Sequence, residues 1–284
     1  MSKLKAYLDI LRPINSLMMG FAVIVGYFIA TQGQLNPLHY QKLVLGFLTG
    51  FFLTASSMVL NDYFDKEIDA VNAPYRPIPS GLISPREAIV YAILLSVAGL
   101  IFSLLINQLC FLLALSSFTV SSLYNALFKK TGLLGNFMVS FCVAIPFIFG
   151  ATIADGISAV SLIFFLMVFL SNTAREIIKG IADVEGDRMR GVLTLAVKYG
   201  GKYASKVAFL LFILAILLSP IPYILGVMGY TYLVLVLIAD LGFIYSSIKL
   251  IGNPSKHMAL RTKKQILLWM FIGLLAFLFG TIFT

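Results

Sequence analysis

Nine long apolar runs, each with few charged residues, constrain this chain more than any other feature of its sequence. A helix needs about 20 apolar residues to cross the hydrocarbon core of a bilayer. The runs lie at roughly 14–31, 40–61, 87–107, 109–128, 133–154, 158–179, 203–225, 229–250 and 264–283. They lack the alternating pattern of barrel strands, and backbone amides in lipid must be hydrogen-bonded internally. The sequence therefore predicts an all-α membrane protein with nine transmembrane helices in one bundle around a central cavity.

The composition supports this prediction and excludes several other classes of protein. Of the 284 residues, 60% are hydrophobic and 12% are charged, whereas a soluble domain has about 25% charged residues. The chain is therefore not an ordinary cytosolic enzyme, a disordered protein or a secreted disulfide scaffold. The net charge of +9 is typical of basic loops at a membrane surface, so we expect membrane lipid as a partner and no nucleic acid.

The basic residues predict the orientation of the chain in the membrane. With nine spans, 20 of the 21 Lys and Arg residues fall on one side, and only Lys42 falls on the other. Cytoplasmic loops carry the excess of Lys and Arg in membrane proteins. We therefore expect a multi-pass protein of the cell membrane with a cytoplasmic N-terminus, an external C-terminus and an active site that faces the cytoplasm.

Two long polar connections, at about 62–86 and 180–202, lie on the predicted cytoplasmic side and begin with acidic groups. The first group reads Asn61-Asp62-Tyr63-Phe64-Asp65-Lys66-Glu67-Ile68-Asp69. On a helix that continues the second span, residues three and four positions apart share a face. The three aspartates and Asn61 are therefore predicted to lie together.

The second acidic group reads Asp183-Val184-Glu185-Gly186-Asp187 and continues the sixth span. It repeats the four-residue spacing of the first group 118 residues later. Lys179 and Arg175 are predicted to extend the face of these aspartates by one and two turns. The recurrence of one pattern after two apolar spans predicts two similar half-bundles whose acidic ends face one cavity.

Carboxylates this close together repel one another, so something positive is expected between them. Ligand sets of oxygen atoms without His or Cys suit a hard cation such as Mg²⁺, which also binds substrate phosphate. Prolines break the helix after the first group, and the loop that follows is predicted to place Arg76 over it. Glu67 and Glu185 lie off the shared faces and are expected in solvent or in salt bridges.

Together these motifs resemble those of the UbiA family of membrane prenyltransferases. The resemblance covers essentially the whole chain, 1–284, as a single domain, and it rests on five features of the sequence. They are Asn61-Asp62-x-x-Asp65-x-x-x-Asp69, Arg76-Pro77-x-Pro79-Ser80-Gly81, Asp183-x-x-x-Asp187, Arg12-Pro13 before the first span, and Tyr124 with Lys129 before Gly132-Leu133-Leu134-Gly135-Asn136. In the family the Tyr and the Lys are four positions apart, whereas Lys129 comes five positions after Tyr124, so either Lys129 or Lys130 points inward.

The resemblance implies transfer of an isoprenyl group from an allylic prenyl diphosphate, with two Mg²⁺ ions bound to the acidic groups. The implied metal ligands are Asn61, Asp62, Asp65, Asp69, Asp183 and Asp187, and the five aspartates are the implied catalytic residues. The implied ligands of the donor diphosphate are Asn61, Arg76, Lys129, Lys179 and Tyr124. Cations at these positions would stabilise the departing diphosphate.

The acceptor is less constrained by the motifs. The compact length and the basic cytoplasmic loops resemble the archaeal ether-lipid branch of the family. That resemblance implies geranylgeranyl diphosphate as donor, geranylgeranylglyceryl phosphate as acceptor and digeranylgeranylglyceryl phosphate as product. A phosphate on the acceptor needs its own cations, for which Arg12, Lys198 and Lys202 are candidates. The alternative acceptor is an aromatic quinone precursor such as 4-hydroxybenzoate or a naphthoate.

Two other classes of membrane protein compete with a prenyltransferase. A cation transporter is a distant alternative because Asp240 lies midway along the eighth span, where acidic residues usually mark function. Asp240 itself is expected to pair with a Lys or to hydrogen-bond to a neighbouring helix. A lipid-phosphate hydrolase would need a nucleophile such as His, yet His39 and His257 lie outside both acidic groups and are expected to be solvated loop residues.

Overall fold

The computed structural model describes residues 2–282, which form helices and loops without any strand. Nine helical stretches in this part of the chain are long and apolar enough to cross a membrane. They are Pro13–Ala30, Pro37–Phe64, Pro85–Leu104, Gln108–Phe128, Leu133–Ile153, Ala159–Ala182, Gly201–Ile224, Tyr230–Gly252 and Lys256–Gly280. The prediction of an all-α membrane protein with nine spans is thus confirmed.

The ends of the spans differ from the predicted ones by a few residues, except at the last span. That helix begins at Lys256 instead of 264, because the Ser255 side chain accepts a hydrogen bond from the Met258 amide at 3.3 Å and starts the helix early. Its basic residues therefore lie on the helix and not in a loop. The predicted end of this span at 283 lies outside the described residues.

The chain divides into two compact units, which are described separately. Unit 1 comprises the described residues up to Tyr27, together with Leu35–Leu127 and Ile145–Gly156. Its elements are α1 (Lys3–Ile10), most of α2 (Pro13–Ala30), η1 (Pro37–His39), α3 (Tyr40–Phe64), α4 (Lys66–Asn72), α5 (Pro85–Leu104), α6 (Gln108–Leu123), most of the π-helix η2 (Tyr124–Phe128) and the second part of α7 (Leu133–Ile153).

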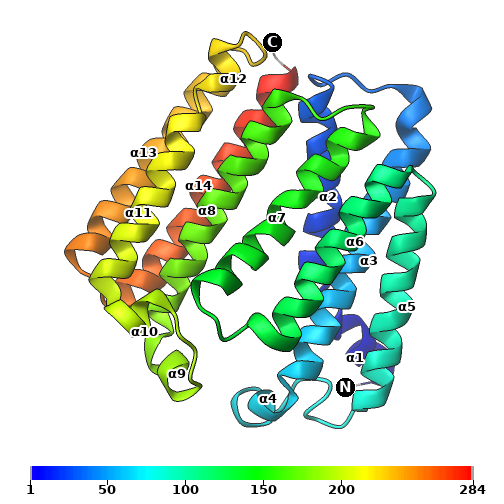
Figure 1. Ribbon diagram of the computed structural model, residues 1–284, viewed down its shortest axis with the longest axis vertical. Coiled ribbons are helices and arrows are strands. Elements are labelled where there is room, and N and C mark those ends of the chain that lie inside the picture. Colours follow the sequence, from blue (N-terminus) through cyan, green and yellow to red (C-terminus); the bar gives the residue numbers. More distant parts are fainter. Residues whose placement is uncertain (1, 283–284) are drawn as a thin grey trace. The chain divides into compact units, whose positions relative to one another are not determined.

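Unit 1 is held together by α3, which packs against α5 and α6 (Figure 1). Small residues allow the backbones of α2 and α7 to cross closely, since a Cβ on Gly26 would meet the backbone of Phe147 and one on Gly150 the carbonyl of Val23. At the start of α5, Ser84 and Glu87 form a reciprocal capping box with Pro85 at the first helical position. These local signals end the long loop that follows α4.

Unit 2 comprises Phe28–Gln34, Phe128–Ala144 and the described residues from Ile157 onward. Its main elements are the first part of α7, α8 (Ala159–Ala182), α9 (Val184–Met189), α10 (Leu195–Tyr199), α11 (Gly201–Leu218), α12 (Ile221–Ile224), α13 (Tyr230–Gly252) and α14 (Lys256–Ile282). In Figure 1, α8, α11, α13 and α14 run side by side. Their shared core includes Ile178, Ile266 and the stacked rings of Phe212 and Phe243.

Candidate active site

The first acidic group lies at the junction of two helices in unit 1. The long helix α3 ends at Phe64, Asp65 forms the junction, and the short helix α4 begins at Lys66. The prediction of one uninterrupted helix is therefore wrong in detail. Helical hydrogen bonding nevertheless continues through the junction, from the Asp65 amide to the Asn61 carbonyl at 3.0 Å and from the Asp69 amide to the Asp65 carbonyl at 2.8 Å. The predicted four-residue repeat is kept.

Two arginines neutralise the most buried carboxylates of this group. Asp62 is only 3% exposed, and its Oδ1 atom lies 2.6 Å from Arg12 Nη2 and 3.5 Å from Arg76 Nη1. Arg76 Nη1 also lies 2.5 Å from Asp69 Oδ2. Arg76 thus lies over the first acidic group, as the sequence predicts. Arg12, a candidate for the acceptor phosphate, instead pairs with Asp62 in this structure.

The backbone on either side holds both guanidinium groups in place. Arg12 lies between α1 and α2 with φ of 47°, a left-handed conformation that costs a residue other than glycine about 1–2 kcal/mol. Its contacts with Asp62 and, at 3.4 Å, with Asn61 Oδ1 oppose that cost. Arg76 lies in a loop anchored by Ile78 and Ile83, which are buried in the core of unit 1.

The charge of Arg76 is set by the aspartates around it. Burial opposes the charged form, but the hydrogen bond to Asp69 and the charges of Asp62, Asp69 and Asp65 raise the pKa of the Arg76 guanidinium above its usual value. Arg76 therefore stays fully charged. A group that holds its positive charge in a partly buried position is suited to bind an anion such as a phosphate.

An amide pair that the sequence did not reveal supports the same site. Asn61 Nδ2 donates to Asn125 Oδ1 at 3.1 Å, and Asn125 Nδ2 donates to the Ser57 carbonyl at 3.3 Å. Asn125 is buried in the π-helix η2, which begins at Tyr124. A π-turn holds one more residue than an α-turn, which fits the separation of five positions, instead of four, between Tyr124 and Lys129. Of the two lysines that follow η2, Lys129 is half-buried and Lys130 is exposed.

The second acidic group, in unit 2, has the same construction as the first. The long helix α8 ends at Ala182, Asp183 forms the junction, and the short helix α9 begins at Val184. The Asp187 amide donates to the Asp183 carbonyl at 2.9 Å, as Asp69 does to Asp65. The recurrence of spacing in the sequence therefore corresponds to a recurrence of local structure.

The charges around Asp187 differ from those around Asp69. Burial raises the pKa of the Asp187 carboxyl above its usual range, Asp183 adds to this rise, and the charges of Arg190 and Lys179 oppose it. The distance between Arg190 Nη2 and Asp187 Oδ1 is 3.8 Å. The Asp187 carboxylate therefore lies farther from its arginine than Asp62 and Asp69 lie from theirs.

Glu176 is a second residue that the sequence analysis missed. Its carboxylate accepts from Arg175 Nη1 at 2.9 Å and from Lys179 Nζ at 3.2 Å. The two cations that we predicted beside Asp183 are therefore held by an acid about two turns before it. The buried Nε atom of Arg175 has no hydrogen-bond partner in the described part of the chain. The i, i+3 relation of Glu176 to Lys179 was a local signal that could have indicated this pair.

A backbone clamp joins the segment after η2 to the loop after α9. The Leu193 amide donates to the Lys130 carbonyl at 3.1 Å, and the Val192 amide donates to the Asp187 carbonyl at 2.9 Å. Gly132 has φ of +67°, and a Cβ atom there would collide with the carbonyl of Leu193. The clamp therefore ties the two lysines after η2 to the chain that carries Asp187.

Replacing Gly132 with alanine is expected to destabilise unit 2. The left-handed backbone and the collision with the Leu193 carbonyl together should lower the free energy of unfolding by at least about 2 kcal/mol. Denaturant unfolding of the purified protein in detergent measures this loss. Gly273→Ala is the matched control, because Gly273 has open space where its Cβ would lie and alanine favours a helix. Equal stability of the two variants would contradict the role of the clamp.

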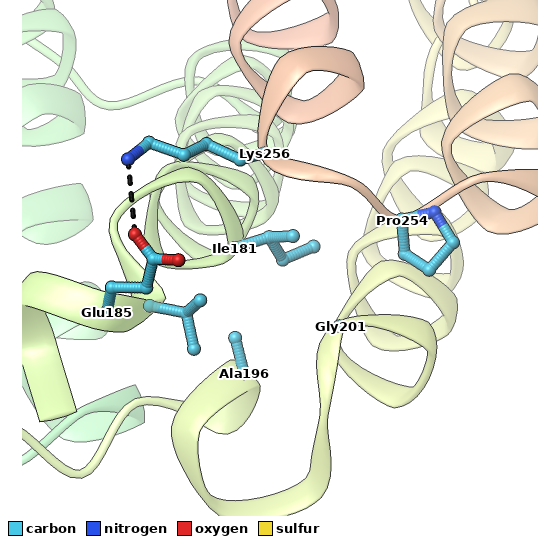
Figure 2. Close-up of a pocket in the computed structure, with 7 residues that line it drawn as sticks. Ile181, Glu185, Ala196, Gly201, Pro254 and Lys256 are labelled. Carbon is cyan, nitrogen blue, oxygen red and sulfur yellow. Dashed lines mark hydrogen bonds and ion pairs between the residues drawn. The ribbon is translucent and has the colours of Figure 1, made fainter.

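A small cavity of ≈ 200 Å³ lies beside α9. It is lined by Ile181, Val184, Glu185, Ala196, Gly201, Pro254 and Lys256. Figure 2 shows Glu185 and Lys256 joined at one side of it, with Lys256 Nζ 3.4 Å from Glu185 Oε2. This confirms that Glu185 forms a salt bridge. Neither Asp183 nor Asp187 lines the cavity, so it belongs to the other side of α9.

The remaining candidates outside the acidic groups have varied surroundings. Lys198 and Lys202 are exposed on α10 and α11.

Asp240 is buried in α13 and accepts a hydrogen bond from Ser219 Oγ at 2.6 Å, so it bonds to a neighbouring segment and not to a Lys. The expectation for His39 is wrong, because its ring is buried and lies 3.1 Å from the Tyr27 hydroxyl and 3.3 Å from Asp155. His257 is exposed, as expected.

No three Asp, Glu, His or Cys side chains converge on one point in residues 2–282. Each acidic group therefore presents its carboxylates singly or in pairs, with lysine or arginine beside them. This donor set of carboxylate and amide oxygens fits a hard cation that completes its coordination with water and phosphate. It does not fit a closed structural metal site, which would need about four protein ligands.

Comparison with known proteins identifies a family and several proteins that are similar to this chain over nearly its whole length. Residues 19–282 match the UbiA prenyltransferase family. The chain is 39% identical over 282 residues to digeranylgeranylglyceryl phosphate synthase of Methanocaldococcus jannaschii, covering 99% of this chain and 98% of that one. It is 38% identical over 290 residues to the enzyme of the same name from Methanosarcina mazei, covering 98% of each.

Solved structures show the same fold. A structure described as digeranylgeranylglyceryl phosphate synthase in membranes superposes with a TM-score of 0.88 at 38% identity and covers 99% of both chains. A UbiA homolog from Archaeoglobus fulgidus, bound to GPP and Mg²⁺, superposes with a TM-score of 0.71 at 20% identity, covering 96% of this chain and 99% of that one. The nine apolar helices, the two acidic helix junctions and the match over nearly the whole chain lead to one conclusion: this protein belongs to the UbiA family and is a multi-pass membrane prenyltransferase.

Proposed function

We propose that this enzyme transfers a geranylgeranyl group from geranylgeranyl diphosphate to geranylgeranylglyceryl phosphate and so forms digeranylgeranylglyceryl phosphate, an ether-lipid precursor. The observation that carries the donor half is the repeated acidic helix junction, Asp65 with Asp69 and Asp183 with Asp187. The acceptor half is supported by relatives named digeranylgeranylglyceryl phosphate synthase that match nearly the whole chain. Family membership argues against the transporter and the hydrolase.

Magnesium is the proposed cofactor, with two ions serving one donor diphosphate. Mg²⁺ takes one or two carboxylates and keeps sites for water and substrate phosphate, which fits junctions where no three acidic side chains converge in the described residues. The Mg²⁺ in the Archaeoglobus fulgidus homolog supports the same choice. The proposed ligands remain Asn61, Asp62, Asp65, Asp69, Asp183 and Asp187, of which the five aspartates are the proposed catalytic residues.

The cations beside these carboxylates have a separate task. When bound, Mg²⁺ acts as a Lewis acid on the diphosphate. We assign Arg76, Lys129 and Lys179 to the oxygens of the leaving diphosphate, where each donates hydrogen bonds that strengthen as negative charge develops. The half-buried Lys129 takes this role in preference to the exposed Lys130. The free Nε of Arg175 is a further donor, and Tyr124 keeps its proposed place beside the diphosphate.

Transfer then proceeds by exchange of one carbon–oxygen bond for another. The bond between the allylic carbon and the diphosphate breaks, and its electron pair leaves with the diphosphate. The free hydroxyl of the glyceryl acceptor attacks the allylic carbon and loses its proton to water, so the products are the ether, diphosphate and one proton. A phosphate on this acceptor is assigned to Lys198 and Lys202, while Arg12 is held by Asp62.

We also propose how the enzyme is placed in the cell. The acidic groups are assigned to the cytoplasmic side, with the N-terminus cytoplasmic and the C-terminus external, because 20 of 21 basic residues fall on one side of the predicted topology. Residues 1–284 are proposed to act as one functional domain. The long connections at about 62–86 and 180–202 are its catalytic loops.

Replacing Arg76 with glutamine is expected to weaken use of the donor selectively. Loss of a charged donor to phosphate should raise the KM for geranylgeranyl diphosphate about tenfold and leave the KM for the acceptor within about twofold. Initial rates with each substrate varied in turn measure both constants. Arg86→Gln, a change at an exposed arginine ten residues further on, is the control. A donor KM unchanged by Arg76→Gln would remove Arg76 from the site.

A reconstituted assay tests the proposed function directly. Purified enzyme is given radiolabelled geranylgeranyl diphosphate with Mg²⁺ and either geranylgeranylglyceryl phosphate or 4-hydroxybenzoate. Labelling of the glyceryl lipid alone, abolished by EDTA and restored by Mg²⁺, is the expected result. Labelling of the aromatic acid instead would overturn the acceptor and keep the prenyl transfer. Transfer that persists in EDTA would overturn the role of the metal.

A further inference from the structure

The positive charge of the chain is distributed unequally between its two units. Unit 1 contains seven of the 21 basic residues and seven of the 12 acidic residues, so its formal net charge is zero. Unit 2 contains 14 basic and five acidic residues. The whole net charge of +9 therefore belongs to unit 2. A general bias toward basic cytoplasmic loops does not account for this difference, since both units contribute such loops.

In unit 1 several basic residues are used in internal ion pairs. Lys3 Nζ lies 2.5 Å from Glu87 Oε1, Arg12 pairs with Asp62, and Arg76 pairs with Asp69. These cations therefore stabilise the unit itself. They leave little positive charge for a partner outside the chain.

In unit 2 the surplus gathers where α10 meets α11 and where α13 turns into α14. Eight basic residues lie there, and seven of them are exposed. They are Lys198, Lys202, Lys206, Lys249, Lys256, Arg261, Lys263 and Lys264, of which Lys263 is half-buried. Among the described residues, only Lys256 of these eight has an ion-pair partner, Glu185. We call this set the basic end of unit 2.

The basic end is one place in the fold, although its members are spread over 67 residues. A Cβ atom on Gly201, the first residue of α11, would lie 3.1 Å from the carbonyl of Pro254 in the turn between α13 and α14. The helices α10 and α11 are contiguous and in contact. In Figure 1 this end of unit 2 carries α10 and the turn that leads into α14.

The three long helices that reach the basic end, α11, α13 and α14, change from apolar to cationic along an exposed face. On α11, residues four positions apart run from the exposed Leu214 and Leu210 to Lys206 and Lys202. Such residues lie above one another on the helix. This row of side chains is therefore apolar along most of α11, as suits a helix surface in hydrocarbon, and is positively charged at the end of the helix.

The other two helices show the same sequence of side chains. On α13, exposed Leu241 is followed by exposed Tyr245 and then by Lys249, whose Nζ lies 4.2 Å from the centre of the Tyr245 ring. On α14, exposed Phe271 and Leu268 give way to Lys264 and Arg261 toward the helix start. Tyrosine and snorkelling lysine are enriched where hydrocarbon meets the lipid headgroups.

A pair of tyrosines on α10 and α11 lies at the same transition from apolar to cationic side chains. Tyr199 and Tyr203 are about half exposed, their ring centres lie 5.1 Å apart, and Lys198 Nζ lies 5.1 Å from the centre of the Tyr199 ring. Half-exposed rings beside cations suit a boundary where one side is apolar and the other is wet. A soluble protein or a nucleic acid would require the cations to point away from the apolar stripes, and here they prolong them.

We propose that the basic end of unit 2 binds the negatively charged headgroups of bulk membrane lipids. The ligand is a lipid of the surrounding bilayer that carries a net negative phosphate, such as phosphatidylglycerol. Binding gathers such lipids around unit 2 and leaves unit 1 with a neutral boundary. Lys198 and Lys202 are already assigned to the acceptor phosphate, so the proposal rests on the other six residues and does not depend on which acceptor the enzyme uses.

The test measures lipid selectivity in the absence of substrates. The full-length protein is reconstituted in phosphatidylcholine bilayers that contain spin-labelled phosphatidylglycerol or spin-labelled phosphatidylcholine. Electron paramagnetic resonance then gives the immobilised fraction of each label. The variant is Lys206→Gln, Arg261→Gln and Lys264→Gln combined. The matched control is Lys3→Gln, Lys5→Gln and Arg86→Gln, which also removes two lysines and one arginine, all exposed and all in unit 1.

The wild-type protein is expected to prefer the labelled phosphatidylglycerol at least about threefold, since each basic residue near an anionic headgroup contributes several-fold to binding. The preference should fall toward unity in the unit 2 variant and persist in the unit 1 control. It should also fall in wild-type protein when NaCl is raised from 0.1 M to about 1 M, because the screening length shrinks from about 10 Å to about 3 Å. The salt result needs no variant to fold. No preference in wild-type protein, or equal loss in both variants, would overturn the proposal.

Discussion

Asp183→Asn is expected to reduce the rate of prenyl transfer by at least about a hundredfold, and Asp65→Asn is expected to do the same. Each substitution keeps the shape of the side chain and removes the negative charge at a helix junction. A cation bound there would lose a ligand, and the charge that develops on the leaving diphosphate would lose its support. Single-turnover rates with labelled geranylgeranyl diphosphate at saturating Mg²⁺ measure the effect on the chemical step.

The chain provides matched controls for both substitutions. Glu185 and Glu67 each lie two residues after a junction aspartate, and both are exposed. Glu185→Gln and Glu67→Gln remove the same charge from the same short helices and should leave the rate within about threefold. If either junction variant kept a rate within threefold of wild type, its acidic group would have no part in transfer. Equal losses in all four variants would instead indicate a general effect of negative charge.

Asp62→Asn is expected to show the second large effect, on stability as well as on activity. Asp62 is almost completely buried and neutralises two arginines. Removing one partner of a buried ion pair costs about 3–5 kcal/mol, and the arginines are about one-third exposed. We therefore expect the free energy of unfolding to fall by about 2–3 kcal/mol. Denaturant unfolding in detergent measures this change.

A double-mutant cycle separates the ion pair from other effects of Asp62→Asn. Arg12→Gln alone should also destabilise the protein, and the two changes together should cost less than the sum of the separate costs, because the pair is lost only once. Asp9→Asn, at an exposed acid of α1, is the control and should be nearly neutral. Strict additivity of Asp62→Asn and Arg12→Gln would show that the 2.6 Å contact contributes nothing to stability.

The acidic groups show which local features can be predicted from the spacing of residues. The spacing of Asp65 and Asp69 predicts that they share a face, and the hydrogen bonds through the junction keep that relation. The break at Asp65 itself was not predicted, because a residue with φ of −88° and ψ of 0° leaves the four-residue repeat almost unchanged. Periodicity is insensitive to such a small bend.

The residues that contact the acidic groups could be identified only from the folded chain, because they come from distant segments of the sequence. Arg12 is 50 residues from Asp62 in the sequence, and Asn125 is 64 residues from Asn61. Nothing in either segment specifies its partner, since many polar residues have the same hydrogen-bonding capacity. His39 shows the same limit, because its loop position predicts solvent while contacts with Tyr27 and Asp155 bury it.

By itself the sequence determined the membrane class, the nine spans and the residues and spacing of both acidic groups. These features depend on the transfer of apolar side chains out of water and on interactions within a few residues. Both can be predicted from the hydropathy and the spacing of residues in the sequence. Only the tertiary structure decided which cations neutralise which carboxylates, that the segment after η2 is clamped to Leu193, and that the basic end of unit 2 has few acidic partners. Such pairings depend on the packing of distant helices, because the short range of hydrogen bonds and ion pairs makes each one a consequence of where the fold brings its groups.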